Sequence, residues 1–402
     1  MKRLIIEYAR ENEPFAVALR RRIHQNPELS GVEFKTLRLI CEQLTNFGIQ
    51  FEEVEDGGIL AYIGGGGNCK TVLLRADIDA LPVVENESNL SCKRAVISQN
   101  PGVAHMCGHD AHTAILLTAA KILKENETEL NGNRVILLFE RGEEGTGNLV
   151  NILKVLTERK ERVDAAHAIH VQPALPVGKL LALGGPFMAG GSVFHVTIKG
   201  CGGHGSRPDH ANSPIDAFTA FNTALGAIRL RNISPYESVS YSIGTLHSGN
   251  KGNIIPNELT FAGSVRVYNE ESFTEFVKAF KNALEHITAA YDCEYTLSGL
   301  SECWSPLINN YDAAEFAIET VKEYLGNDTL AVSEPLMGSE SFGRIAALYP
   351  GIMLNLGVAN EALGTGADWH SEYFDIDESA LLNGVIETVA FAMEFLNSEV
   401  RF

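Results

Sequence analysis

Short runs of consecutive apolar residues, each followed by a helical pattern, set the strongest constraint on how this chain can fold. Such runs lie at residues 71–76, 135–139 and 165–171. Apolar residues at helical spacing occur between them, over residues 113–123 and 148–156. Strands that are apolar at successive positions are buried on both faces. The order therefore predicts an α/β domain with a mixed, mostly parallel sheet covered by helices on both sides.

The pattern changes between residues 185 and 300. Strand, helix, strand, strand, helix and strand are predicted there, at 192–199, 215–230, 239–246, 258–267, 272–291 and 294–298. This βαββαβ order is that of a ferredoxin-like α+β unit. Helix and strand alternate again from residue 313 onward. The simplest architecture is one domain built from residues 1–184 and 301–402, with a second domain inserted at 185–300.

Charge and cysteine content narrow the class of protein. The 402 residues carry 32 Lys and Arg against 51 Asp and Glu, a net charge of −19, so no basic face is expected for nucleic acid. No apolar run approaches the ~20 residues that span a bilayer, so no membrane is expected as a partner. The seven cysteines are odd in number and widely scattered, which does not resemble a disulfide framework. We expect a soluble, cytoplasmic protein.

The densest group of possible metal ligands is the segment 105–112, HMCGHDAH, which holds three of the twelve histidines. Cys107 and His109 cannot share a helix face, but they can share one side of an extended segment just before the predicted helix. Both could therefore point at one metal ion. The alternative is a buried cysteine beside histidines that cap the helix.

Further candidates follow the other predicted strands. Glu143 and Glu144 come directly after the strand at 135–139, and functional groups of α/β sheets gather beyond the carboxyl ends of strands. Adjacent carboxylates repel unless a cation lies nearby, so one could bind metal while the other faces a water molecule. A solvated acidic loop is the alternative. His170 ends the next strand and His370 lies in a glycine-rich loop; each alone could be structural, but their coincidence favours a metal site.

Five separated motifs together resemble one family. They are RADIDALP at 75–82, MCGHDAH at 106–112, the Glu143–Glu144 pair, HVQPALPVG at 170–178 and GGHGSRP at 202–208. In this order they resemble the metal-dependent amidohydrolases of N-acyl amino acids, which include hippurate hydrolase, N-acetyldiaminopimelate deacetylase and auxin-conjugate hydrolase, relatives of aminoacylase and glutamate carboxypeptidase. The resemblance covers nearly the whole chain and also implies an inserted domain.

The resemblance implies roles for individual residues. The ligands of a two-metal centre would be Cys107, His109, Glu144, His170 and His370. Glu143 would be the general base, and Asp77 would support the ligands from behind. His204 resembles a histidine that reaches the active site of the partner subunit, and Asn253 and Arg266 resemble substrate-binding residues. The resemblance thus implies a homodimer formed through the inserted domain, which also acts as a lid.

Zinc is the expected metal, with manganese, nickel or cobalt as alternatives. The expected reaction is hydrolysis of an N-acyl amino acid or a similar small amide that carries a carboxylate. The alternatives are a dipeptidase or aminopeptidase of the same wider family, and a catalytically silent metal-bound binding protein. Only Arg141 favours the silent protein: the chain has Glu140-Arg141-Gly142 where the family usually has Gln-Pro-Ala, which puts an acid and a cation beside the base.

Overall fold

The computed structural model describes residues 2–65, 69–145 and 147–402, which form two compact units. The first unit comprises Met1–Gly185, Asn309–Glu334 and Ile345–Phe402, and the second comprises Pro186–Ile308 and Pro335–Arg344. The chain passes between them in the paired strands β7 (Gly185–Met188) and β14 (Leu307–Asn309). The first unit is therefore built from both ends of the chain. The segment Pro335–Arg344 joins the second unit, which the sequence pattern did not indicate.

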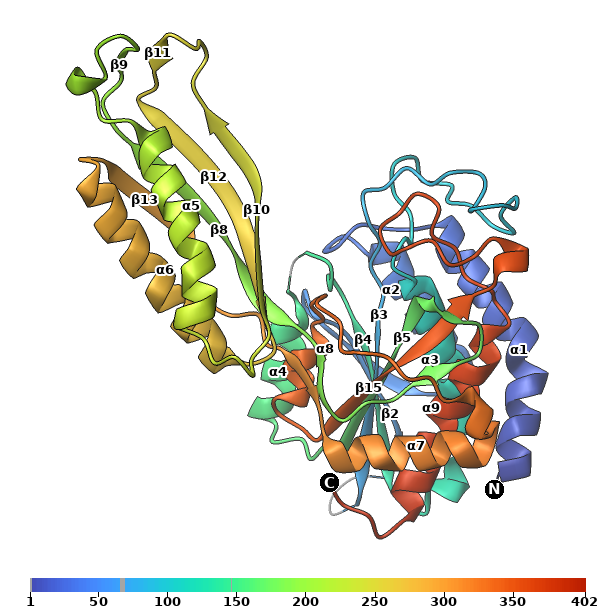
Figure 1. The fold of residues 1–402 in the computed structure, drawn as a ribbon. Coiled ribbons are helices and arrows are strands. Elements are labelled where there is room, and N and C mark those ends of the chain that lie inside the picture. The colour runs from blue at the N-terminus through green and yellow to red at the C-terminus, as the bar shows by residue number, and fades with distance from the viewer. Residues whose placement is uncertain (1, 66–68, 146) are drawn as a thin grey trace. The chain divides into compact units, whose positions relative to one another are not determined.

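A seven-stranded mixed sheet forms the centre of the first unit (Figure 1). In spatial order its strands are β1 (Gln50–Val54), β2 (Gly58–Gly64), β4 (Arg134–Glu140), β3 (Thr71–Asp77), β5 (Ala165–Pro176), β15 (Gly351–Ala359) and β6 (Leu180–Leu181). The four strands from β4 to β15 are parallel, whereas β1, β2 and β6 pair antiparallel at the edges. The predicted mixed α/β sheet is confirmed, and β3 and β4 are buried along almost their whole length.

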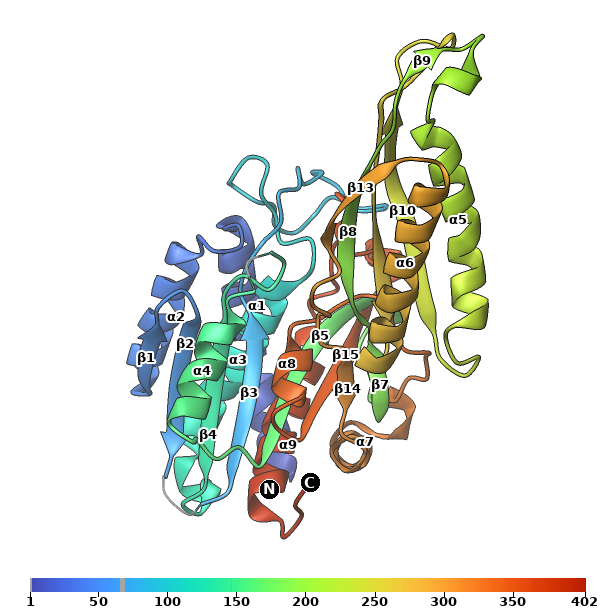
Figure 2. The same cartoon turned by 90° about the vertical axis from the view of Figure 1, so that its left-hand side faces the viewer.

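Helices cover both faces of this sheet. In Figure 2, α4 lies in front of the sheet, while α1 and α3 lie behind it. The helices of the unit are α1 (Lys2–Gln25), α2 (Phe34–Phe47), α3 (His109–Glu125), α4 (Leu149–Glu158), α7 (Tyr311–Leu325) and α9 (Ala380–Asn397), and the short α8 (Phe342–Ala346) lies at its boundary. Single 3₁₀ turns occur at Glu127–Leu130, Asn327–Thr329 and Glu361–Leu363.

Helix α9 belongs to the core. By length and composition it is the one described helix that could cross a membrane, yet 78 % of its 18 residues are buried inside the protein. It packs against α1, α3, α7 and the strands β3, β5 and β15. Gly384 permits this close packing, because a Cβ atom there would lie 2.6 Å from Ile115 Cδ1. The burial is that of a central helix in a folded domain.

The second unit has the expected βαββαβ order. Its elements are β8 (Gly190–Lys199), α5 (Pro214–Arg231), β10 (Val239–Ser248), β12 (Glu258–Val267), α6 (Glu270–Ala290) and β13 (Glu294–Gly299). The strands form an antiparallel sheet in the order β10-β12-β8-β13, and buried phenylalanines fill the space between sheet and helices. The short strands β9 (Gly203–His204) and β11 (Ile254–Ile255) pair separately, and Pro208–His210 is a 3₁₀ turn.

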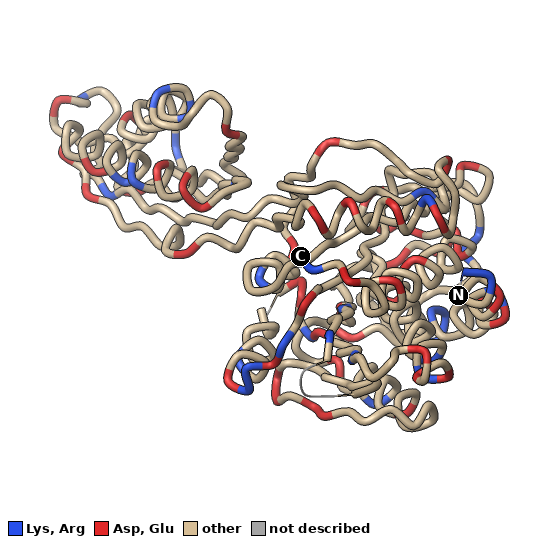
Figure 3. The backbone as a smooth tube through the Cα atoms, turned by 90° about the horizontal axis from the view of Figure 1, so that it is seen from below, with Lys and Arg blue, Asp and Glu red and all other residues tan. Residues whose placement is uncertain are grey.

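Basic and acidic positions are interspersed along both units (Figure 3), and the cysteines are not joined by disulfides. Figure 3 shows the Lys and Arg positions scattered among the acidic positions along each unit. All seven cysteines lie in the described part of the chain, and all are free thiols. Local packing therefore decides what each thiol can do.

Candidate metal centre

The parallel register of β3, β4 and β5 brings the functional segments to one edge of the sheet. Asp77, the last residue of β3, is paired with Glu140, the last residue of β4, so the loops that follow both strands start side by side. Glu143 and Glu144 lie in a turn just after β4, and His170 lies on β5. The topology of the sheet thus places carboxylate and imidazole side chains at the same edge.

His109, at the start of α3, is held in the orientation of a metal ligand. Its Nδ1–H donates to Asp79 Oδ1 over 3.0 Å, while its buried Nε2 has no hydrogen-bond partner among the described residues. A ligating histidine usually donates its other ring N–H to a carboxylate, which fixes the ring and the tautomer. An Nε2 that makes no hydrogen bond within the described part of the chain and lies 3.7 Å from Asp77 Oδ2 and 3.9 Å from Glu144 Oε1 fits a bound cation.

Cys107 and Glu144 complete a group around His109. One ligand atom from each of the three lies within 4.8 Å of the others. Gly108 has φ +88°, and a Cβ there would lie 2.2 Å from Val171 Cγ2, so glycine is needed between the cysteine and the helix. Burial raises the pKa of the Cys107 thiol well above its usual value, although His109 opposes the shift. A bound cation would overcome this and hold the thiolate.

His170 faces the same group from β5. Its Nδ1–H donates to the carbonyl of Val171 at 2.8 Å, and its Nε2 lies 3.7 Å from Cys107 Sγ. Burial, helped by the neighbouring His112, lowers the pKa of His170 well below its usual value. Its Nε2, the nitrogen not bonded to Val171, faces Cys107, the position expected of a second ligand to the same cation.

His370 reaches the group from the far end of the sequence. Its backbone N–H donates to the carbonyl of Met106 at 2.8 Å, and its ring Nε2 lies 3.1 Å from Glu144 Oε1. The Glu144 side chain is 13 % exposed, which a solvated acidic loop does not explain. His370 has φ +63°, a conformation uncommon outside glycine, so the backbone is held in a restricted shape to present this ring.

His112 lies close enough to Asp77, His109 and His170 to be a ligand by distance, but both of its nitrogens are occupied. Its Nε2 accepts the N–H of Val171 at 2.9 Å, so Nδ1 carries the proton and donates it to Asp77 Oδ1 at 2.6 Å. His112 therefore holds Asp77 in place. No role was predicted for His112 from the sequence, although its position one helical turn after His109 was a usable signal.

Asp79 was also missed, and it organises the site. One oxygen accepts from His109, and the other accepts from the Ser30 hydroxyl at 2.5 Å and from the Glu144 N–H at 3.0 Å. It thus fixes the ligand ring and the turn that carries the glutamate pair. The signal was the Asp-Ile-Asp spacing, which puts residues 77 and 79 on the same side of an extended segment.

The charges beside the glutamate pair are engaged with buried partners. Arg75 donates to Asp77 Oδ2 at 2.9 Å and to Glu140 Oε2 at 2.7 Å. Arg141 donates to Glu33 Oε2 at 2.9 Å and to the carbonyl of Gly31 at 2.6 Å. The carboxylate of Glu33 pairs with the guanidinium of Arg141. The presence of Arg141 therefore does not favour a catalytically silent protein.

Three predicted residues lie in the second unit. His204, on β9, is exposed, and its Nδ1 accepts from the Ser206 hydroxyl at 2.8 Å. Asn253 is next to it, since its carbonyl accepts from the Gly205 N–H at 2.9 Å. Arg266, on β12, donates to the Ser339 hydroxyl and lies over the Trp304 ring, 5.2 Å from its centroid. The structure brings His204 and Asn253 together and places Arg266 separately on the main sheet of that unit.

Comparison with known proteins places these features in a family. A model described as "Peptidase family M20/M25/M40" matches residues 73–394. The chain is 33 % identical to the IAA-amino acid hydrolase ILR1-like 4 of Arabidopsis thaliana, over 96 % of this chain and 88 % of that protein. It is 31 % identical to the N-acetyl-L-cysteine deacetylase of Bacillus subtilis, over 95 % and 88 %. A solved Bacillus subtilis structure, described as a dinuclear metal binding peptidase from the M20 family, matches 96 % of this chain and 99 % of its own with a TM-score of 0.78 and 26 % identity.

The thiol of Cys107 provides a direct check on the candidate metal centre. If a cation holds it as a buried thiolate, alkylation of Cys107 should be slow in zinc-loaded protein and faster after chelation, because the ligated sulfur is shielded. Site-resolved mass spectrometry would follow the label. The exposed Cys201 is the internal control, and its rate should not depend on zinc. Equal labelling of Cys107 with and without chelator would contradict ligation.

Proposed function

Because this chain belongs to peptidase family M20/M25/M40, we propose that it hydrolyses N-acyl amino acids, or similar small amides that carry a carboxylate, at a centre of two divalent metal ions. Membership makes the chain a metal-dependent hydrolase of amide bonds. The observation that carries the proposal is the meeting of Cys107, His109 and Glu144 within 4.8 Å beside Glu143.

The substrate class follows from the relatives. One is named an IAA-amino acid hydrolase and another an N-acetyl-L-cysteine deacetylase. Both names describe an amide between an acyl group and an amino acid. A peptidase acting on dipeptides is the second candidate, favoured by the description of the matching family.

The proposed ligands are Cys107, His109, Glu144, His170 and His370, with zinc as the proposed metal because a thiolate is among them. The cations would polarise the amide carbonyl and lower the pKa of a water molecule in the site towards ~7. Glu143 takes the proton from that water and delivers it to the leaving nitrogen. Asp77 accepts hydrogen bonds from Arg75 and His112, and its carboxylate places a negative charge behind the metal ligands.

Three residues of the second unit have proposed roles of their own. Arg266 and Asn253 bind the substrate oxygens through hydrogen bonds, of which those from the guanidinium are charge-assisted. His204 stabilises the oxyanion in the active site of a partner subunit, so the enzyme acts as a homodimer formed through this unit. The exposure of His204 supports this role, as do its hydrogen bonds, in which Nδ1 pairs with the backbone N–H and the hydroxyl of the neighbouring Ser206.

Substrate choice can be tested by turnover of zinc-loaded enzyme. N-acetyl, N-benzoyl and indole-acyl amino acids should be cleaved, whereas dipeptides should be cleaved slowly or not at all. The matched control is the same N-acyl amino acid with its carboxylate converted to an amide, which should lose binding because Arg266 then has no anionic partner. Faster cleavage of dipeptides than of every N-acyl amino acid would favour the peptidase.

The two glutamates should separate by their effects on metal and rate. Glu143→Ala should retain metal and lose activity by about 10²- to 10⁴-fold, the usual worth of a general base. Glu144→Ala should lose metal, because a ligand is removed. Metal content and kcat measured on the same samples decide the assignment. Loss of metal from Glu143→Ala with metal and turnover kept in Glu144→Ala would reverse the two roles.

The role of His204 across the dimer predicts that two inactive variants rescue each other. A heterodimer of Glu143→Ala and His204→Ala subunits has one site with both defects and one site with neither. Activity should therefore rise well above that of either variant alone after subunit exchange. Exchange would be verified with tagged subunits, and mixing two batches of one variant is the control. Verified exchange without recovery would place His204 in its own subunit's site or outside catalysis.

A further inference from the structure

The segment that carries His370, residues 363–375, is bonded near both of its ends by one loop, residues 86–94. Near its start, Asn89 Nδ2 donates to the carbonyl of Leu363 at 2.9 Å, and the Leu90 N–H donates to that of Gly364 at 3.2 Å. Near its end, the loop bonds the carbonyls of residues 372 and 374. His370 lies between these two attachments.

Arg94 makes the attachment at the end of the segment. Its guanidinium donates to the carbonyl of Glu372 at 2.8 Å, to that of Phe374 at 2.6 Å and, within its own loop, to that of Asn86 at 2.7 Å. The Arg94 side chain is 0 % exposed. Such a planar fork can bond several carbonyls in fixed directions, which the single ammonium of lysine cannot reproduce.

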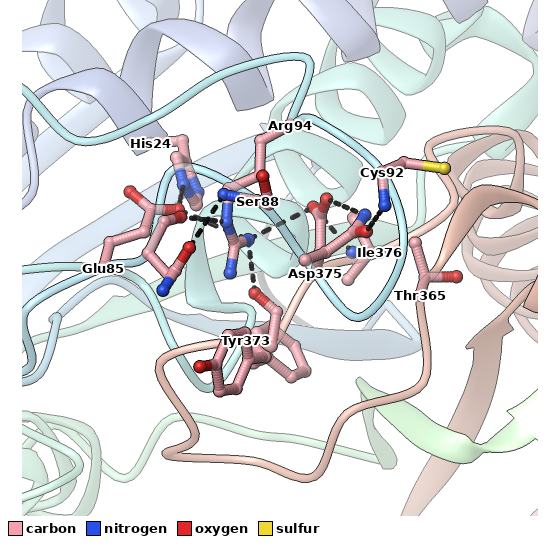
Figure 4. A network of polar contacts seen from close by, with 12 residues as sticks. His24, Glu85, Ser88, Cys92, Arg94, Thr365, Tyr373, Asp375 and Ile376 are labelled. Atoms are coloured by element: carbon pink, nitrogen blue, oxygen red, sulfur yellow. Dashed lines mark hydrogen bonds and ion pairs between the residues drawn. The ribbon is translucent and has the colours of Figure 1, made fainter.

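Carboxylates on both sides compensate the buried charge of Arg94. Its Nη1 lies 3.4 Å from Glu85 Oε1 and 3.8 Å from Asp375 Oδ1, and Figure 4 shows Arg94 between these two residues. Asp375 belongs to the segment of His370, and its other oxygen accepts from Asn89 at 2.9 Å. Charge compensation and backbone bonding therefore fix the same piece of chain.

The network also reaches the start of α3, which carries His109. His24 bridges Glu85 and Asp110, with both ring nitrogens at 2.8 Å from a carboxylate oxygen, and Arg20 donates to Asp110 at 2.7 Å. Asp110 directly follows His109 in the sequence. One buried network thus joins the two segments that present His109 and His370.

We propose that Arg94 is a positioning residue for His370: by bonding the carbonyls that follow it, Arg94 holds the His370 ring in place against Glu144. This inference rests on the proposed metal centre. Replacing Arg94 should weaken binding of the metal ion that His370 holds. It should not change binding of a metal ion held only by ligands from other segments. Contacts of this indirect kind typically change metal affinity by about 10- to 100-fold.

The test compares Arg94→Lys, His370→Ala and the double variant in zinc titrations with buffered free metal. Arg94→Lys should weaken one of two binding steps by about 10- to 100-fold and leave the other unchanged. In the double variant, Arg94→Lys should add nothing to the loss caused by His370→Ala, because two changes that act through one contact are not additive. Additive losses would overturn the inference.

A second readout needs no turnover. Trp369 precedes His370 and donates its Nε1–H to the carbonyl of Val171 at 3.1 Å. With Trp304 replaced by phenylalanine, acrylamide quenching in the metal-free protein reports Trp369 alone among the two tryptophans. Quenching should increase in Arg94→Lys because the segment is released. Unchanged quenching together with unchanged zinc affinity would overturn the inference.

Two further variants serve as a control and as a substitute for Arg94→Lys. Arg134→Lys is the matched control: Arg134 also pairs with a carboxylate, Glu161, at 2.9 Å, but it lies at the opposite end of β4, so neither readout should change. If Arg94→Lys does not fold, Asn89→Ala removes the bonds to Leu363 and Asp375 and should weaken the same binding step. Native zinc affinity in a folded Asn89→Ala would then overturn the inference.

Failure of this inference can be told apart from failure of the proposed centre. If His370→Ala keeps both binding steps, His370 is not a ligand, and the proposed centre and this inference fail together. If His370→Ala loses one step while Arg94→Lys binds zinc like the unchanged protein, the centre stands and only the role of Arg94 is overturned.

Discussion

The buried carboxylate of Asp77 is the constraint on which the rest of the site depends. Burial raises the pKa of this carboxyl, but His109, His112 and Arg75 outweigh burial and hold its pKa well below the usual value. A charge in the interior is tolerated only when it is paired and hydrogen-bonded. Asp77 is accordingly hydrogen-bonded to His112 on α3 and to Arg75 on β3, which places both side chains behind the ligand group.

Asp79 extends this order to the loop after β4. Because it accepts from both His109 and the Glu144 N–H, it aligns a ring nitrogen with the turn that carries both glutamates. Adjacent residues on a turn point in different directions, and Glu144 is the one whose carboxylate lies with Cys107 and His109. In the proposed mechanism this geometry divides the labour between a ligand and a base.

The His370 segment has a different physical basis. It is far from the other ligands in sequence, is not part of the sheet and adopts an uncommon backbone conformation at its key residue. Loop ordering costs about 1–2 kcal/mol per residue in backbone entropy, so such a segment needs strong local attachments. Here the attachments are buried bonds to carbonyls by Arg94 and Asn89, balanced by Glu85 and Asp375.

The sequence by itself determined the mixed parallel sheet, the βαββαβ order of the second unit and the family, because apolar periodicity and short motifs are local properties. It did not predict the antiparallel edge strands β1, β2 and β6. The sequence also predicted that Cys107, His109 and Glu144 meet, and one ligand atom of each lies within 4.8 Å of the others. It placed His170 at the end of a strand, whereas His170 lies within β5. Only the tertiary structure decided that both nitrogens of His112 are occupied, that Asp79 links ring and turn, that Arg141 is balanced by Glu33, and that residues 86–94 hold the segment of His370. These are contacts between residues distant in sequence or choices among hydrogen-bond partners, and residue type and spacing do not encode them.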